Sequence, residues 1–399
     1  VTVTAPNTST DRTITLPDST GTLLDTTSGL DATKLSGNLP AISGASLTSV
    51  NAVNGGRKNM IINGAMQVSQ RGTSFTDPAS GAFTLDRWKA GVHTSTAAAN
   101  YTQEADAPTA AQAGTNFVNC LKIDVTTIDT STAATIRYYT KYQIEGYDIA
   151  PAGFGQSGVR YMTLSFWHKH TKTGINSFGI VSGDNGRHYV SEYTQTTSDT
   201  WEKATHTFPV DTTGTWVTNN AKAMNIYFAA HIGSNYEKTA NTWGTGQGYG
   251  TANQVNNFDS TSNNMRFTGV QLEMGSVATD FEHRSYGEEL ALCQRYYYLL
   301  GSGANSPLCT AFSFASTQMS AFVILPVTMR AAPSLDTTSG TDYYRYSNGT
   351  NVNMTGVALD TVSNKVASIY KGSLSVTQGQ AGMFLGIHSS SYLAFSSEL

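Results

Sequence analysis

The feature that most constrains this chain is its leading segment, residues 1–56, which contains no aromatic residue. Its apolar residues are single Val, Ile and Leu side chains separated by small or turn-forming residues. A segment this short would need large apolar groups to bury a core of its own. Identical chains wound about one axis can instead share a thin core, because small residues allow close approach. We therefore expect an interchain shaft, and the alternative is a flexible Gly/Ser/Thr linker.

The spacing of the apolar residues favours the shaft. A strand-like alternation over 13–24 ends in turn residues, and a short Leu-Ser-Gly motif recurs with related forms from residue 30 onward. Such regular spacing is not expected of a linker. The side chains predicted to meet their copies in neighbouring chains are Leu24, Leu30, Leu35, Leu39, Ile42 and Leu47.

The composition of the whole 399-residue chain excludes several classes of protein. Aromatic residues make up 10%, so there is enough apolar surface to offset chain entropy, and wholesale disorder is excluded. Charged residues make up only 13%, against about 25% in typical soluble domains, so neutral polar groups must supply the surface. No apolar run approaches the roughly 20 residues of a spanning helix. The net charge of -4 predicts no nucleic-acid partner.

Strand patterns begin after residue 57. Apolar and polar residues alternate in several segments, and in 265–273 the alternation changes register after Gly269, as a β-bulge would require. Turn-forming clusters and long polar loops separate these segments, which predicts an antiparallel jelly-roll β-sandwich over 57–285. The clearest alternating segments are 117–125, 161–168 and 224–230.

One helix is predicted, over 286–300, as a connector between domains. Ser285 and Glu288 form a capping box at its start, and Gly301 is a natural stop. A second, C-terminal β-rich tip domain is predicted over 301–399. The apolar stripe of the helix consists of Leu290, Cys293, Tyr297 and Leu300.

Several short motifs, taken in order, resemble bacteriophage tail fibres. Asn59-Met-Ile-Ile-Asn-Gly-Ala-Met66, followed by Gln70-Arg71-Gly72, resembles the opening of the carbohydrate-binding-module-like jelly roll of these fibres. The segments 13–24 and 34–44 resemble fibre shafts, and 326–333 resembles a recurrent motif of the distal β-domain. Further segments that resemble strands of the jelly roll or its closing part are 85–88, 161–169, 201–208, 267–286 and 289–298.

The resemblance implies a mainly β, homotrimeric virion fibre on the particle surface. Its N-terminal end would contact other virion proteins, and its distal part would bind a host-surface glycan or outer-membrane receptor. Three copies per fibre would amplify weak sugar contacts by raising the effective concentration. We expect neither nucleic-acid binding nor membrane insertion.

Three alternatives remain open. The chain could be a capsid-decorating or purely architectural fibre, a polysaccharide depolymerase, or a bacterial carbohydrate-binding protein unconnected to a virus. A glycosidase needs two carboxylates facing one cleft, and the acidic residues here are scattered among strand ends and turns. No long parallel β-helix repeat, GxSxG motif or P-loop is present in the sequence. We therefore expect no enzymatic activity.

The sequence also offers metal-binding patterns, which we interpret as structural. His168 and His170 share one face of a strand, but no third ligand is identifiable. Asp184-Asn185 and the segment 256–259 carry oxygen ligands suited to a structural calcium, yet Asn and Asp are also the default turn residues. We expect no cofactor, with turn chemistry favoured over calcium. The three cysteines are predicted to be free thiols: Cys120, Cys293 and Cys309.

The favoured glycan-contacting surface is the long polar loop 234–264. Aromatic planes bury the C–H faces of sugars, and amide side chains satisfy sugar hydroxyls. Trp243 lacks apolar alternation around it, so burial in a strand is not expected to account for it. A second candidate is the group Tyr343, Tyr344, Tyr346 and Asn348, although Tyr343 or Tyr344 must face a core. The residues predicted to contact glycan are Trp243, Tyr249, Tyr236, Asn253 and Gln254.

Overall fold

The computed structural model describes residues 57–93 and 97–399. The predicted shaft, residues 1–56, lies outside these described residues, and so do its predicted contacts. Those contacts are Leu24, Leu30, Leu35, Leu39, Ile42 and Leu47.

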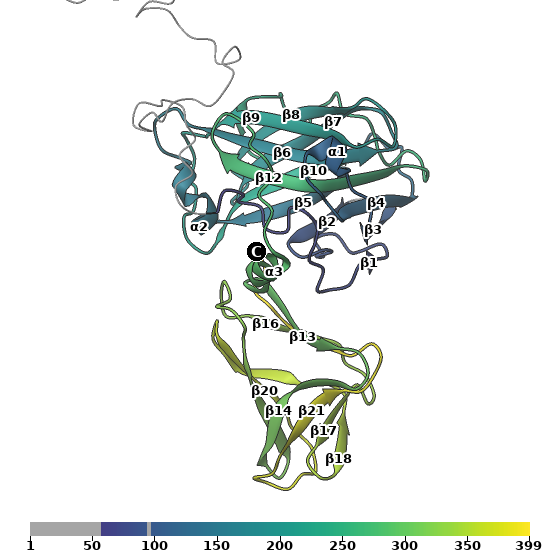
Figure 1. Ribbon diagram of the computed structural model, residues 1–399, viewed down its shortest axis with the longest axis vertical. Helices are drawn as coiled ribbons and strands as arrows, with labels where there is room; N and C mark the ends of the chain where they lie inside the picture. The colour runs from purple at the N-terminus through teal and green to yellow at the C-terminus, as the bar shows by residue number, and fades with distance from the viewer. Residues whose placement is uncertain (1–56, 94–96) are drawn as a thin grey trace, which may run out of the picture. The chain divides into compact units, whose positions relative to one another are not determined.

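Two six-stranded antiparallel sheets form a β-sandwich (Figure 1). The first sheet has the order β1-β3-β4-β12-β6-β9, so its central strand β12 comes from late in the chain. The strands of the first sheet are β1 (Ser74–Phe75), β3 (Ala98–Glu104), β4 (Cys120–Thr127), β12 (Asn264–Met274), β6 (Tyr161–His170) and β9 (Glu202–Pro209).

The second sheet has the order β11-β8-β7-β10-β5-β2, and its neighbouring strands also pair antiparallel. Its strands are β11 (Trp243–Thr245), β8 (Arg187–Gln195), β7 (Gly174–Ser182), β10 (Lys222–Ile232), β5 (Arg137–Glu145) and β2 (Trp88–His93). The prediction of a mainly β chain with an antiparallel sandwich is therefore confirmed.

The alternating residues of these strands fill the space between the sheets. Leu121 and Ile123 on β4 are buried, as is Leu164 on β6. Phe166 on β6 has its ring 5.0 Å from that of Phe228 on β10, which joins the two sheets across the core. Burying aromatic side chains of this size supplies most of the stabilisation available to a sandwich.

The predicted β-bulge lies where the sequence placed it. The pairing of β12 with β6 shifts register between Thr268 and Gln271, and Gly269 has a φ of 60°. Residues other than glycine adopt that conformation only with strain. A Cβ on Gly269 would also lie 2.8 Å from the ring of Phe117, so both backbone and packing require glycine here.

Two further sheets follow the sandwich. The seven-stranded sheet has the order β18-β17-β21-β14-β15-β20-β19, and the three-stranded sheet has the order β13-β22-β16. They enclose a separate core that includes Met319, Tyr344, Ile369 and Phe384. The strands are β13 (Tyr297–Ser302), β14 (Ser306–Ala315), β15 (Gln318–Ile324), β16 (Ser334–Thr337), β17 (Tyr344–Ser347), β18 (Asn351–Met354), β19 (Ala358–Val362), β20 (Val366–Lys371), β21 (Ala381–Gly386) and β22 (Tyr392–Ser396).

The predicted helix is shorter than expected. Helix α3 (Tyr286–Gln294) begins with the predicted capping box, but it ends at Gln294 instead of residue 300. Two neighbouring tyrosines just beyond the helix explain the difference: Tyr296 and Tyr297 are both buried, Tyr296 in the sandwich core and Tyr297 against Arg71. Successive side chains can point to opposite sides only in extended chain, so 297–302 forms strand β13 and Gly301 lies within it.

Single helical turns were also missed by the prediction of one helix. They are α1 (Ala110–Ala113), α2 (Gly146–Ile149) and the 3₁₀ turn at Ala150–Ala152. Within the described residues no helix is long and apolar enough to cross a membrane.

Ion pairs join the residues after β22 and helix α3 to the sandwich. Glu398 accepts hydrogen bonds from Arg87 and Arg71, and Arg295 donates to Glu145 at 2.6 Å and 3.0 Å. The end of the chain accordingly lies beside α3 (Figure 1).

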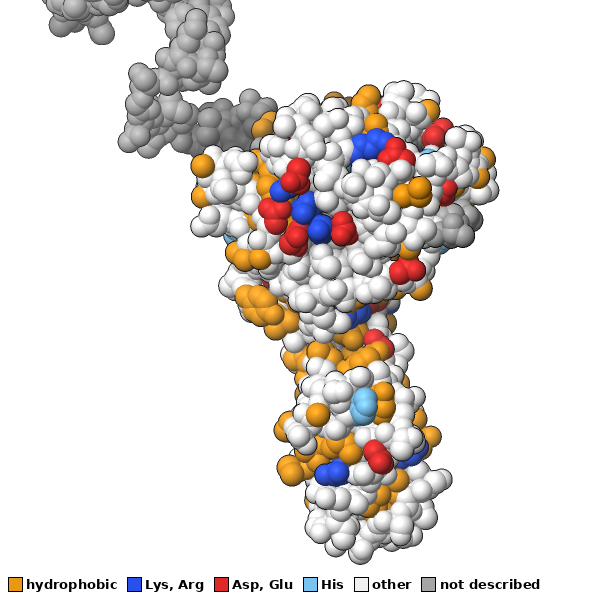
Figure 2. Space-filling model, turned by 90° about the vertical axis from the view of Figure 1, so that its right-hand side faces the viewer, with side chains coloured by type: hydrophobic (Ala, Val, Ile, Leu, Met, Phe, Trp, Pro, Cys, Tyr) orange, Lys and Arg blue, Asp and Glu red, His pale blue; other side chains and the backbone are white. Residues whose placement is uncertain are grey.

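Most of the visible surface is uncharged, as the composition predicts. Figure 2 shows acidic and basic side chains gathered in small groups of mixed sign on a largely neutral face. The largest network in the first sheet is centred on Arg266, which pairs with Glu104 at 2.6 Å and with Asp106 and Asp199 at 3.3 Å.

Candidate functional site

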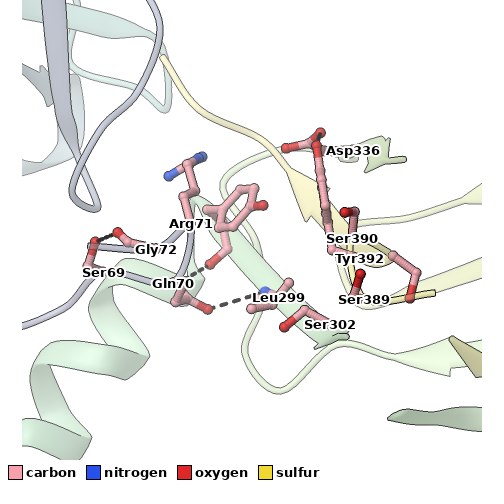
Figure 3. Close-up of a pocket in the computed structure, with 12 residues that line it drawn as sticks. Ser69, Gln70, Arg71, Gly72, Leu299, Ser302, Asp336, Ser389, Ser390 and Tyr392 are labelled. Atoms are coloured by element: carbon pink, nitrogen blue, oxygen red, sulfur yellow. Dashed lines mark hydrogen bonds between the residues drawn. The ribbon is translucent and has the colours of Figure 1, made fainter. Parts of the chain in front are cut away.

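A cavity of about 470 Å³ opens between the loop 69–72 and the three-stranded sheet β13-β22-β16 (Figure 3). The loop precedes β1 of the sandwich, whereas the opposite wall comes from the C-terminal part of the chain. The residues that line the cavity are Ser69, Gln70, Arg71, Gly72, Tyr297, Leu299, Ser302, Asp336, Ser389, Ser390, Ser391 and Tyr392.

Gln70 fixes the loop to strand β13. Its side-chain nitrogen donates to the Asp86 carboxylate at 2.6 Å and to the Tyr297 carbonyl at 2.7 Å, and its side-chain oxygen accepts from the Leu299 backbone at 3.2 Å. Asp86 also accepts from the Gln70 backbone, and burial raises the pKa of this carboxyl. The amide is fully used within the protein, so this wall is held in place before any ligand arrives.

Arg71 supplies positive charge to the cavity wall. Its guanidinium carbon lies 3.4 Å from the centroid of the Tyr297 ring, and its Nη2 donates to Glu398 at 3.3 Å. Stacking and one ion pair fix the plane of the guanidinium. Its Nη1 is buried and has no hydrogen-bond partner.

Asp336 and Tyr392 face each other from adjacent strands, β16 and β22. The Tyr392 hydroxyl donates to Asp336 at 2.8 Å, and burial raises the pKa of Tyr392 to about 12. The Tyr392 phenol therefore orients the carboxylate, which presents an acceptor to the cavity.

Serine hydroxyls complete the rim. Ser302, Ser389 and Ser390 are exposed, whereas Ser391 is buried and donates to the carbonyl oxygens of Gly303 and His388. The cavity thus combines a tyrosine wall, a carboxylate acceptor, a guanidinium donor and small hydroxyls. This combination is suited to a polyhydroxylated ligand with apolar C–H faces, such as a sugar.

The loop 234–264 is organised differently from the prediction. Trp243 belongs to β11, is half-buried, packs against the sandwich core and donates from Nε1 to the Pro209 carbonyl at 2.7 Å. Tyr249 is only 3% exposed and belongs to a separate cluster on the outer face of the second sheet. Packing therefore accounts for both rings, contrary to the expectation for Trp243. The sequence around them lacks alternation because Trp243 lies in a strand of only three residues and Tyr249 lies in a loop.

The other predicted loop residues are more open. Tyr236 is half-buried and stacks on Tyr249 with centroids 5.0 Å apart. Asn253 is exposed, donates to Glu192 at 3.0 Å and lines a second, open cavity of about 590 Å³. Gln254 holds both side-chain polar atoms buried without a partner. The structure brings Tyr236 and Tyr249 together but places Trp243 in a different cluster.

Other patterns also have structural explanations. His168 and His170 are buried in the core, and the Gln195 side chain bonds both the His168 ring at Nδ1 (2.9 Å) and the His170 backbone. Tyr344 and Tyr346 are buried in the C-terminal core, as expected for at least one residue of the tyrosine pair. Among the described residues no group of three or more His, Cys, Asp or Glu side chains could hold a metal ion.

Sequence reasoning missed Arg71, Asp336 and Tyr392 as candidate ligand contacts. Arg71 stands in the Gln-Arg-Gly motif that carries part of the resemblance, which could have marked it. Asp336 and Tyr392 carry no local signal, because only the pairing of β16 with β22 brings them together.

No family model matches this chain, and no curated protein matches it. Among solved structures, the enzymatically active domain of tailspike protein 4 from bacteriophage CBA120 is 14% identical, with a TM-score of 0.29; the match covers 54% of this chain and 21% of that one. A CBM4 structure is 14% identical, with a TM-score of 0.27, and 53% and 98% of the two chains are covered. The family 11 carbohydrate-binding module of the cellulase Lic26A-Cel5E from Clostridium thermocellum is 13% identical, with a TM-score of 0.26 and coverage of 53% and 98%.

Proposed function

We propose that this protein is a homotrimeric bacteriophage fibre that adheres to glycans on the host surface. The observation that carries the proposal is the cavity that Asp336, Tyr392 and Arg71 line together with exposed serine residues. These groups match the hydrogen-bonding and stacking needs of a sugar ring. The aromatic-free segment 1–56 and the order of the fibre-like motifs support the assignment to a fibre.

The binding would be multivalent. A cavity of this kind makes few contacts, so one copy would bind a sugar weakly, and linking three copies raises the effective concentration of the second and third sites. Tyr236 and Asn253 would add a secondary contact beside the second cavity.

The mass in solution of the full chain and of a variant lacking 1–56 tests the proposed trimer. A trimer that becomes a monomer on deletion supports the shaft, and a monomeric full chain contradicts it.

The cavity is tested by two variants and two matched controls. On a glycan array, Tyr392→Ala and Asp336→Asn should each lose binding by about tenfold or more, because the first removes a stacking surface and the second removes a carboxylate acceptor. The controls are Tyr286→Ala, whose ring is 58% exposed on α3, and Asp360→Asn, which is exposed on β19. Wild-type protein that binds no glycan would favour an architectural fibre instead.

We further propose that the protein acts without catalysis. In the cavity Asp336 is the lining residue that carries a carboxylate, and a glycosidase would need a second one facing it. Incubation with host polysaccharide followed by an assay for new reducing ends tests this statement. New ends that disappear in Asp336→Asn would show a depolymerase.

A further inference from the structure

Two lysines stand directly opposite each other on the outer face of the second sheet. Lys89 on β2 and Lys141 on β5 are cross-strand partners, so their side chains leave the sheet on the same side. Lys222 on β10 is close enough to influence the charge of both, and Arg137 extends the same row of β5. Like charges placed directly opposite each other destabilise a sheet, so this arrangement needs an explanation.

Two acidic residues lie near these cations, but both form ion pairs with other arginines. Glu145 is the cross-strand partner of Lys222, and Glu398 raises the pKa of Lys89. In the described parts of the chain no Asp or Glu oxygen lies within salt-bridge distance of Lys89, Arg137, Lys141 or Lys222. Lys89 donates to the Leu399 carbonyl at 2.8 Å, and the Nε of Arg137 is buried without a hydrogen-bond partner.

The contrast with the first sheet is informative. There Lys122, Lys169 and Arg266 each pair with carboxylates, so the chain does compensate clustered cations elsewhere. On the second sheet, burial first and mutual repulsion next lower the pKa of both Lys89 and Lys141 to about 8. Both amines still carry most of their charge at neutral pH. A fold that keeps an unfavourable charge arrangement commonly does so at a functional site.

Aromatic rings lie next to the cations on the same face. Tyr227 is the β10 partner of Lys141, and the Lys141 amine is 5.7 Å from its ring centroid. Tyr139, Tyr227 and Tyr249 form one cluster, and Tyr236 packs against it with the Arg137 guanidinium 4.8 Å from its ring. Positive charge beside aromatic surface is suited to a ligand that has both a ring with C–H faces and an acid group.

We propose that the outer face of β2 and β5 binds an anionic glycan, with a carboxylate or phosphate group of the sugar between Lys89 and Lys141. The proposal deepens the proposed glycan adhesion and rests on it for the choice of a sugar. The overall charge of -4 favours a sugar acid over nucleic acid, because a nucleic-acid surface would need a broader positive field.

Isothermal titration calorimetry of the full chain tests the proposal with four probes: trigalacturonate, inorganic phosphate, neutral cellotriose and a thymidine oligonucleotide. Wild-type protein should bind trigalacturonate or phosphate, and whichever binds identifies the acid group. Lys141→Met and Lys89→Met should weaken that binding by about tenfold or more, whereas Lys203→Met, an exposed lysine on β9, should not.

A second readout separates a ligand site from a folding defect. Because Lys141→Met removes repulsion, its unfolding midpoint in urea should not fall below that of the wild type, even though binding is lost. Equal binding of the acid probe by wild type and both variants, tighter binding of the oligonucleotide, or no binding of either acid would overturn the proposal. Cellotriose carries no acid group, so its binding should not change in the lysine variants. Tyr392→Ala and Asp336→Asn should leave acid binding at β2 and β5 unchanged, so failure of the cavity and failure of this site are distinguishable.

Discussion

The ion pair between Arg87 and Glu398 allows a quantitative test of how the end of the chain contributes to stability. The two side chains are 1% and 5% exposed, so both charges are removed from water. Arg87 also donates to the Gln143 carbonyl at 2.7 Å, and its guanidinium carbon lies 3.5 Å from the ring of Tyr296. In Glu398→Gln the guanidinium stays buried, while its carboxylate partner becomes neutral.

Removing one member of a buried pair costs about 3–5 kcal/mol, because an uncompensated charge remains in a medium of low polarity. We expect Glu398→Gln to lower the free energy of unfolding by about 3 kcal/mol, since the amide oxygen still accepts a hydrogen bond. Replacing both partners removes the two charges of this pair and leaves only Arg71 without its carboxylate, so Arg87→Met combined with Glu398→Met should recover part of the loss.

Urea unfolding followed by tryptophan fluorescence measures these differences, provided that the m-value stays constant across the variants. Trp88 is fully buried beside Tyr142, so its emission reports the sandwich core. A loss below about 1 kcal/mol in Glu398→Gln, or a double variant less stable than the single one, would refute the reasoning that this pair is desolvated.

Three further predictions concern the sandwich. Burial lowers the pKa of His168 to about 4, below the value of about 6.5 for an unfolded chain, so the stability that this residue contributes is complete above pH 6.5 and declines as the pH falls toward 4. Between pH 7 and pH 5 this contribution should fall by about 2 kcal/mol. Burial also lowers the pKa of His170, so in pH-dependent urea titrations His168→Gln should remove the His168 share of the loss and leave the His170 share. Gly269→Ala should destabilise by about 2–3 kcal/mol in urea unfolding, through its φ of 60° and the contact of the new Cβ with Phe117. Gly287→Ala in α3 is the control: its new Cβ would meet no atom within 4 Å, so it should be neutral or stabilising. Arg266→Met should destabilise by about 1–3 kcal/mol at low salt and by less at 1 M salt, and an effect independent of salt would contradict an electrostatic role.

Local patterns predicted the parts of the fold that local chemistry controls. The alternation of apolar residues placed the core faces of β4, β6 and β10, and the phase change at Gly269 placed the bulge. The capping box of Ser285 and Glu288 fixed the start of α3. In each case the physical cause acts within a few residues, so a short stretch of sequence is enough to predict the feature.

Features that depend on distant partners were not predicted. The end of α3 is set by the burial of Tyr296 and Tyr297 on opposite sides of the chain, and the apolar stripe alone suggested a longer helix. Asp336 and Tyr392 meet only through the pairing of β16 with β22. The predicted loop ring Tyr249 is buried because Gly179 and Val181 on β7 leave it a place to pack, which no local pattern reveals.

The position of β12 in the first sheet has a consequence for biosynthesis. Its residues pair on one side with β4 and on the other with β6, both of which leave the ribosome much earlier. Until β12 emerges, those two strands have open edges next to each other, and edges of this kind recruit other chains. A nascent polypeptide halted before residue 274 would therefore be expected to aggregate. Chaperones that bind unfolded chains would be needed until β12 has been synthesised.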